Sequence, residues 1–90
     1  MARPMGKHMK EKAETEMWNS KVRDGVMITM KAAHLNHDLM AQRLGMGSTT
    51  LWRRLVDPGQ FSLSELRGIE RLARDNGYTF TYQIGGMPNG

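Results

Sequence analysis

The chain has 90 residues and a mass of 10.2 kDa, which is enough for one small domain with a helical core. It contains no cysteine, so a disulfide scaffold, a thiolate metal site and a cysteine nucleophile are excluded. Thirteen Lys and Arg residues against nine Asp and Glu give a net charge of +4, which suits a nucleic acid, an acidic protein or an anionic membrane surface. The longest apolar run, Val26–Ile28, is too short to cross a bilayer, so we expect a cytoplasmic protein without a membrane partner.

Residues 1–19 are predicted to form an N-terminal arm that contains at most a short helix. Apolar residues recur every four positions, at Met5, Met9, Ala13 and Met17, and three lysines each precede a glutamate by four residues. Both spacings weakly support a helix. The first interpretation is an amphipathic helix that packs according to its context, and the alternative is a basic arm that follows a phosphate backbone.

Residues 20–34 are expected to be helical because apolar residues fall on one stripe: Val22, Val26, Met30 and Ala33. Gly25 costs about 1 kcal/mol inside a helix, which would move the helix start to Asp24. A strand through Val26–Met30 is the competing prediction, since this run is rich in residues that favour strands.

Three later segments each combine an N-cap residue with two apolar residues at the hydrophobic-staple positions, which is a helix start signal. The caps are Asn36, Gly47 and Ser62, and the staple pairs are Leu35/Met40, Met46/Leu51 and Phe61/Leu66. Glu65 would complete a capping box with Ser62, and the stop signals are Gly45, Pro58 and Asn76-Gly77. The sequence therefore predicts helices over about His37–Leu44 and Ser48–Val56, and a third helix that closes at Asn76-Gly77.

Residues 78–84 alternate apolar and polar side chains, and this pattern predicts a half-buried strand. One face would pack on the helices and the other would point to solvent. Because a lone strand leaves backbone groups unpaired, we predict that two copies pair along it as a homodimer. The predicted interface residues are Tyr78, Phe80, Tyr82 and Ile84.

The first two of the three capped helices, with the turn between them, predict a helix–turn–helix. Leu51 and Leu55 would face inward, so the opposite face of the second helix would be free to enter a DNA groove. The predicted base contacts are Ser48, Thr49, Trp52 and Arg53, and the predicted phosphate contacts are Asn36, His37, Arg43, Thr50 and Arg54. Residues 39–56 contain no acid, which favours DNA as the partner.

His34–Gly45 resembles the first helix of the helix–turn–helix in phage-repressor and Cro-type regulators, which reads Gly-Leu-Thr-Gln-Glu-Glu-Leu-Ala-Glu-Lys-Leu-Gly. Leu44–Leu55 is similar to the turn and recognition helix of that family, and Phe61–Leu66 to the start of its fourth helix. The resemblance implies a mainly α, lambda-repressor-like bundle of about four to five helices, with the C-terminal strand in place of the fifth helix.

The resemblance also implies a sequence-specific regulator that binds double-stranded DNA by operator occupancy, of phage or plasmid type and too short for a sensory domain. His37 stands where the family has a phosphate-contacting Gln, and Arg54 where many members keep an apolar residue. The alternative is a protein-binding module on the same scaffold, such as an antitoxin or an inhibitor of a nucleic-acid enzyme. Its working surface would be Tyr78–Ile84 with Met5–Met17.

No catalytic constellation is recognised, so we expect neither an enzyme nor a cofactor, metal or small-molecule ligand. The three histidines lack a metal-ligand spacing, the serines lack a nucleophile elbow, and Gly45-x-Gly47 lacks the Lys-Ser/Thr of a phosphate loop. The predicted organisation is an arm (1–19), a helix–turn–helix domain (20–77), and a strand and tail (78–90).

Overall fold

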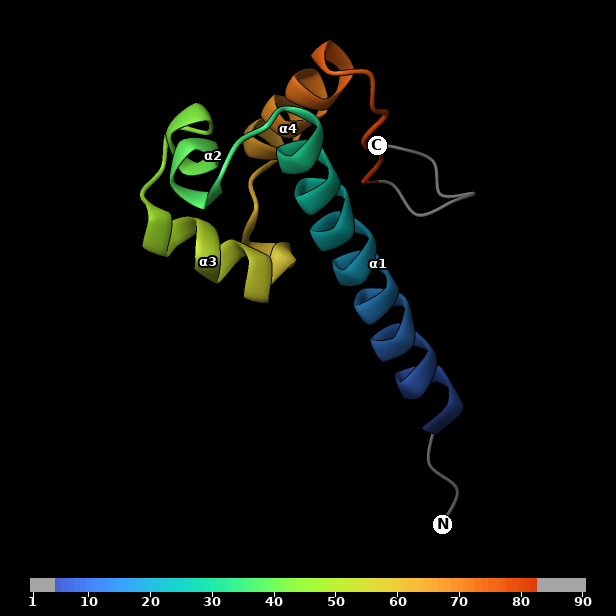
Figure 1. The fold of residues 1–90 in the computed structure, drawn as a ribbon. Helices are drawn as coiled ribbons and strands as arrows, with labels where there is room; N and C mark the ends of the chain where they lie inside the picture. Colours follow the sequence, from blue (N-terminus) through green and yellow to red (C-terminus); the bar gives the residue numbers. More distant parts are fainter. Residues whose placement is uncertain (1–4, 83–90) are drawn as a thin grey trace.

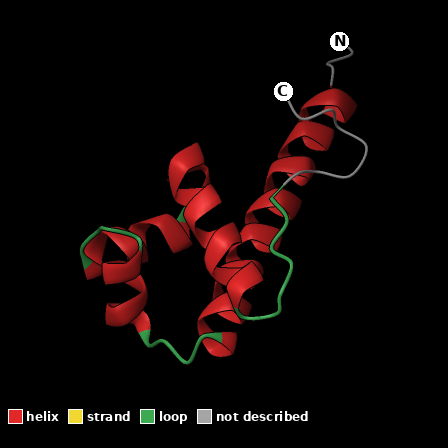
Figure 2. Cartoon of the chain, turned by 90° about the horizontal axis from the view of Figure 1, so that it is seen from above, coloured by secondary structure: helices red, strands yellow, loops and turns green. Residues whose placement is uncertain are grey.

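The computed structural model describes the backbone of residues 5–82 and the side chains of residues 14–82. This part of the chain forms four α-helices and one short 3-10 helix: α1 Met5–Ala32, α2 His37–Arg43, α3 Ser48–Val56, η1 Pro58–Gln60 and α4 Leu63–Asp75. The later helices gather around the C-terminal half of α1, and the N-terminal half extends away from them (Figures 1 and 2). The mainly helical class is therefore confirmed, and no helix in the described residues could span a membrane.

α1 is one continuous helix of 28 residues that crosses the predicted boundary between residues 19 and 20. Val26–Met30 lies within it, so the helix prediction for this run is confirmed and the competing strand prediction is wrong. The expected interruption at Gly25 does not occur. A Cβ atom on this glycine would lie 2.4 Å from Cδ1 of Phe80, so the missing side chain makes room for the aromatic ring. Packing against a distant residue thus explains a glycine that local propensity disfavours.

The core lies where α1 meets the other three helices. α1 contributes Val22, Val26 and Met30; α2 and α3 contribute Met40, Ala41, Leu51 and Leu55; and Leu66, Ile69 and Ala73 come from α4, with Phe61 and Phe80 from the connecting and C-terminal segments. The hydroxyl of the buried Thr29 donates a hydrogen bond to the carbonyl oxygen of Gly25, 2.7 Å away. The predicted stripe residues Val22, Val26 and Met30 are buried, and so are Leu51 and Leu55, which the sequence predicted to face inward.

The predicted helix starts are present. The side chain of Asn36 accepts a hydrogen bond from the Leu39 N–H at 2.9 Å. Both bonds of the capping box exist, with Glu65 N–H to Ser62 Oγ at 3.0 Å and Ser62 N–H to Glu65 Oε1 at 2.9 Å. Gly47 caps α3 without a side chain. Local capping residues therefore fix where these helices begin.

Three helices end in the same way, with a backbone N–H bonded to the carbonyl oxygen five residues earlier. The bonds are Leu35 to Met30, Met46 to Ala41 and Tyr78 to Ala73, each 2.9 Å long. The residue before each donor has a positive φ: 57° at His34, 72° at Gly45 and 82° at Gly77. Leu35 and Met46 thus close one helix while occupying the residue before the N-cap of the next.

The predicted C-terminal strand is absent from residues 78–82, and residues 83–84, with Ile84, lie outside the described part. Residues 78–82 instead run back along α1 (Figures 1 and 2). Phe80 is buried beside Gly25, and the indole N–H of Trp18 donates a hydrogen bond to the Tyr82 carbonyl oxygen. The inward aromatic face is confirmed for Tyr78, Phe80 and Tyr82, which pack on the helices although residues 78–82 form no strand.

Candidate functional site

α3 buries one side and exposes the other. Leu51 and Leu55 lie in the core, whereas Thr49, Trp52 and Arg53 are exposed, with 58% of Trp52 accessible. The two remaining hydroxyl residues of the helix, at positions 48 and 50, are half-buried. The structure therefore brings three of the four predicted base contacts together on one accessible face.

The start of α2 packs on the middle of α3 through two aromatic rings. The imidazole of His37 stacks on the indole of Trp52, with ring centroids 4.2 Å apart and an interplanar angle of 21°. The Nε2 atom of His37 is buried and has no hydrogen-bond partner among the described residues. The ring of His37 therefore packs against the ring of Trp52. Because its Nε2 atom is buried, this atom is not available for the phosphate contact that the sequence predicted.

A carboxylate links α2 to the first residue of α3. Ser48 Oγ donates a hydrogen bond to Asp38 Oδ1, 2.5 Å away, and the Asp38 side chain is 78% exposed. The sequence analysis did not single out Asp38, which lies just outside the acid-free residues 39–56. No local spacing rule relates two residues that are ten positions apart.

An arginine from α1 caps the other end of α3. Arg23 Nε donates a hydrogen bond to the Leu55 carbonyl oxygen at 2.7 Å, and a terminal guanidinium nitrogen lies 3.4 Å from the Val56 carbonyl oxygen. Asp38 and Arg23 therefore place a negative charge at the N-terminus and a positive charge at the C-terminus of α3, as its macrodipole favours. No spacing pattern in the sequence indicates this contact between α1 and α3, whose residues are 32 and 33 positions apart.

Arg54 turns toward α4, away from the exposed face of α3. Its Nε lies 3.1 Å from Glu65 Oε1, and a terminal nitrogen lies 3.5 Å from Oε2. Burial by itself would raise the pKa of Glu65, but hydrogen bonds from Arg54 and Ser62 and the charge of Arg54 outweigh it and lower the pKa below 4.5. The structure therefore does not bring Arg54 together with the other predicted DNA contacts.

The other predicted phosphate contacts differ in accessibility. Arg43, at the end of α2, is exposed, and Asn36 is exposed while its side chain caps α2. Thr50 is half-buried. No group of three potential metal ligands occurs within the described residues.

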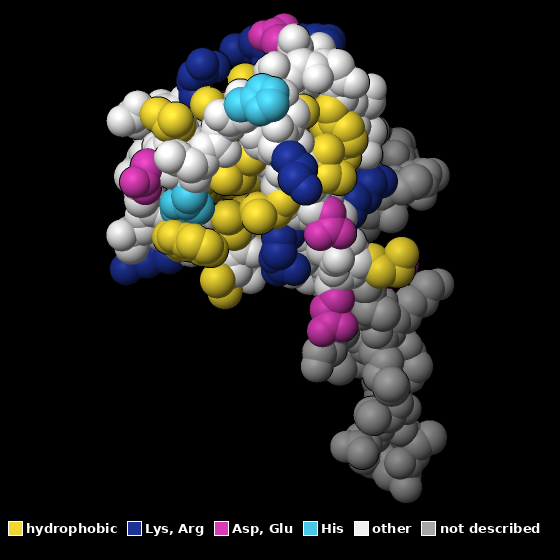
Figure 3. All heavy atoms as spheres, viewed as in Figure 1, with side chains coloured by type: hydrophobic (Ala, Val, Ile, Leu, Met, Phe, Trp, Pro, Cys, Tyr) yellow, Lys and Arg dark blue, Asp and Glu magenta, His cyan; other side chains and the backbone are white. Residues whose placement is uncertain are grey.

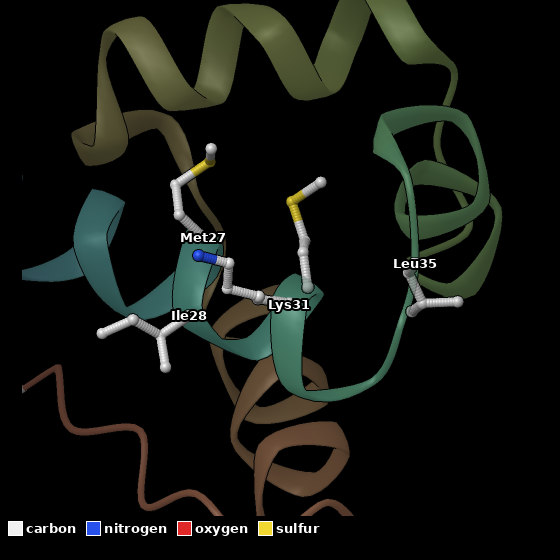
Figure 4. A pocket seen from close by; sticks show the side chains of 5 residues that line it. Met27, Ile28, Lys31 and Leu35 are labelled. Carbon is white, nitrogen blue, oxygen red and sulfur yellow. The ribbon is translucent and has the colours of Figure 1, made fainter.

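An apolar hollow of about 350 Å³ lies on the side of α1 that faces α3. It is lined by Met27, Ile28, Met30, Lys31 and Leu35 (Figure 4). Met27 and Lys31 rise on the same side of the helix, and Leu35 lies beyond its end. Seen from the side of Figure 1, the space-filling view shows hydrophobic side chains gathered over the helical part, with Lys or Arg and His side chains between them (Figure 3).

The described residues define a small helical protein in which two short helices, joined by a tight turn, present one exposed face of α3. Comparison with protein-family models, curated proteins and solved structures finds no match for the chain.

Proposed function

We propose that this protein is a sequence-specific regulator of double-stranded DNA that acts by occupying an operator, with α2 and α3 as its helix–turn–helix. The observation that carries this proposal is the two-sided character of α3. Leu51 and Leu55 anchor the helix in the core, while Thr49, Trp52 and Arg53 stay accessible. A helix anchored in this way can enter a major groove as a rigid unit.

Each exposed side chain has a distinct role in this proposal. The Arg53 guanidinium can form two hydrogen bonds with a guanine edge, and the short Thr49 side chain allows close approach to the bases. Trp52, supported by the ring of His37, offers an apolar surface to a thymine methyl group. Arg43 supplies a phosphate contact from the end of α2.

A homodimer is part of the proposal, since two-fold symmetry places two recognition helices about 34–36 Å apart on successive major-groove faces. Residues 78–82 offer no strand for pairing two copies, and Phe80 is only 2% exposed within its own chain. We therefore propose the dimer without strand pairing through residues 78–82 and without Phe80 as a contact. The measured mass of the free and DNA-bound protein in solution tests this component.

The central test is a titration with duplex DNA at several salt concentrations. If Arg43 and neighbouring donors neutralise about three to five phosphates, the log–log salt slope should be about −2.7 to −4.5. Arg53→Ala should relax the base preference at one position, at a cost of about 1–3 kcal/mol for the preferred base. Arg67→Ala, an exposed arginine on α4, makes the same charge change and should keep that preference. Absence of binding at low salt would contradict the proposal.

The apolar hollow on α1 favours a second candidate, a protein-binding module. Met27 and Ile28 are 51% and 44% exposed, and flexible methionines suit a surface that adapts to an apolar anchor. Lys31 at the same hollow would pair with an acidic group of the partner. The DNA titration separates the two functions, because only the DNA-binding function requires an affinity for duplex DNA that falls with salt and a base preference that depends on Arg53.

A further inference from the structure

We propose that Asp38 and Ser48 together select a base with an exocyclic amino group in the major groove, cytosine above all, at one operator position. This inference rests on the proposed DNA-binding function and assigns Asp38 as a specificity-determining residue. It follows from which atoms at this edge of α3 can still donate or accept a hydrogen bond.

The hydrogen bond between the two side chains leaves only acceptors for a ligand. The Ser48 hydroxyl proton points to Asp38 Oδ1, so the free capacity of Ser48 Oγ is its oxygen lone pairs. An ionised carboxylate donates nothing, and the high exposure of Asp38 leaves Oδ2 accessible. A group that binds here must therefore donate a hydrogen bond.

The four bases differ in what they offer to such a pair. Cytosine presents only its N4 amino donor in the major groove, whereas adenine places the N7 acceptor beside its N6 donor. Guanine presents the acceptors O6 and N7, and thymine presents O4 and a methyl group. Cytosine is therefore preferred, adenine is tolerated less well, and guanine and thymine are rejected.

The contacts between α2 and α3 keep Asp38 beside the exposed face of α3. The His37–Trp52 stack fixes the residue before Asp38 against α3, and Ser48 fixes the carboxylate itself. Like-charge repulsion disfavours a contact between this carboxylate and a phosphate, whereas the amino group of a base in the groove offers it a hydrogen-bond donor. When α3 enters the groove, Asp38 therefore enters beside it.

The experiment compares three proteins in selection from a random duplex library, followed by titrations against operators that carry each base at each position. Wild type should prefer cytosine over guanine and thymine at one position by roughly 5- to 150-fold. Asp38→Asn keeps an acceptor for Ser48 but adds an amide donor, so its preference at that position should move to adenine. Asp24→Asn, an exposed aspartate on α1, makes the same charge change and should keep the wild-type preference.

The outcomes separate this inference from the function on which it rests. Sequence-specific binding by all three proteins with one unchanged base preference would overturn the role of Asp38 alone. Equal effects of the two substitutions would overturn it too, because they would report net charge. Absence of salt-dependent duplex binding by wild type would overturn both the DNA-binding proposal and this inference. Thermal melting of each variant verifies that the fold is retained.

Discussion

At the scale of single residues, two glycines inside helices predict opposite effects of the same substitution. A Cβ at Gly25 would lie 2.4 and 2.5 Å from two ring carbons of Phe80, whereas a Cβ at Gly68 would meet Leu44 Cδ2 at an ordinary 3.7 Å. Alanine gains about 1 kcal/mol of helix propensity at either site, but overpacking costs roughly 1–3 kcal/mol.

We therefore expect Gly25→Ala to lower the free energy of unfolding by up to about 2 kcal/mol and Gly68→Ala to raise it by up to about 1 kcal/mol. Urea denaturation followed by circular dichroism measures both. If Gly25→Ala is stabilising to the same extent as Gly68→Ala, the ring of Phe80 does not lie on α1.

At the scale of helices, the orientation of α3 depends on a residue from another helix. The hydrogen bond from Arg23 to the Leu55 carbonyl oxygen satisfies an acceptor at the end of α3 and places a positive charge there. Arg23→Ala should lower stability by about 1–2 kcal/mol, and the exposed Arg67→Ala should change it by less than about 0.5 kcal/mol. Equal denaturation midpoints for the two variants would show that α3 does not need this cap.

The contact between α3 and α4 predicts a pH dependence. Because the folded pKa of Glu65 is lowered, its contribution to stability is present above about 4.5 and is lost as the pH falls through the folded pKa. Glu65→Gln should reduce stability near neutral pH and flatten its acid decline. Arg54→Gln should have the same effect, and the double variant should add little, because both partners belong to one interaction. Additive losses in this cycle would contradict the coupling.

Elements that depend on neighbouring residues could be predicted from the sequence, and contacts between distant residues could not. The bounds of α2, α3 and α4 follow from caps such as Asn36 and Ser62 and from turn glycines such as Gly45, which act within a few positions. The Trp18–Tyr82 hydrogen bond joins residues 64 positions apart, and no alternation pattern specifies it. The strand prediction is wrong over residues 78–82 for the same reason, since a period of two shows which face is buried without showing what covers it.

The same distinction applies to the candidate site, where exposure along one helix could be predicted and contacts between helices could not. Helical periodicity predicted that Leu51 and Leu55 are buried and that Thr49, Trp52 and Arg53 are exposed. It could not show that Arg54 pairs with Glu65, or that Asp38 reaches Ser48, because side chains from different helices decide these contacts. The sequence alone does not distinguish an arginine that forms an ion pair, such as Arg54, from an exposed one such as Arg53.

At the scale of the whole molecule, residues 78–82 close the core between α1 and α4. Phe80 fills the space above Gly25, and Tyr82 accepts a hydrogen bond from Trp18 on α1 while its hydroxyl lies 3.4 Å from a Glu70 carboxylate oxygen on α4. Phe80 is 2% exposed, so its ring belongs to the core although it lies outside the helices. The helical part is therefore incomplete without this segment.

We expect Phe80→Ala to lower the free energy of unfolding by about 3–5 kcal/mol, which is a large part of the roughly 5–15 kcal/mol that stabilises an ordinary domain. Thr81→Ala, at the exposed neighbouring position, should change it by less than about 0.5 kcal/mol. Chemical denaturation of the two variants, with solution mass measured over a range of concentrations, separates a core role from a role in pairing two copies. A folded Phe80→Ala protein with wild-type stability and a reduced mass would assign this ring to an interface between copies. Loss of stability without a change in mass assigns it to the core of a single chain.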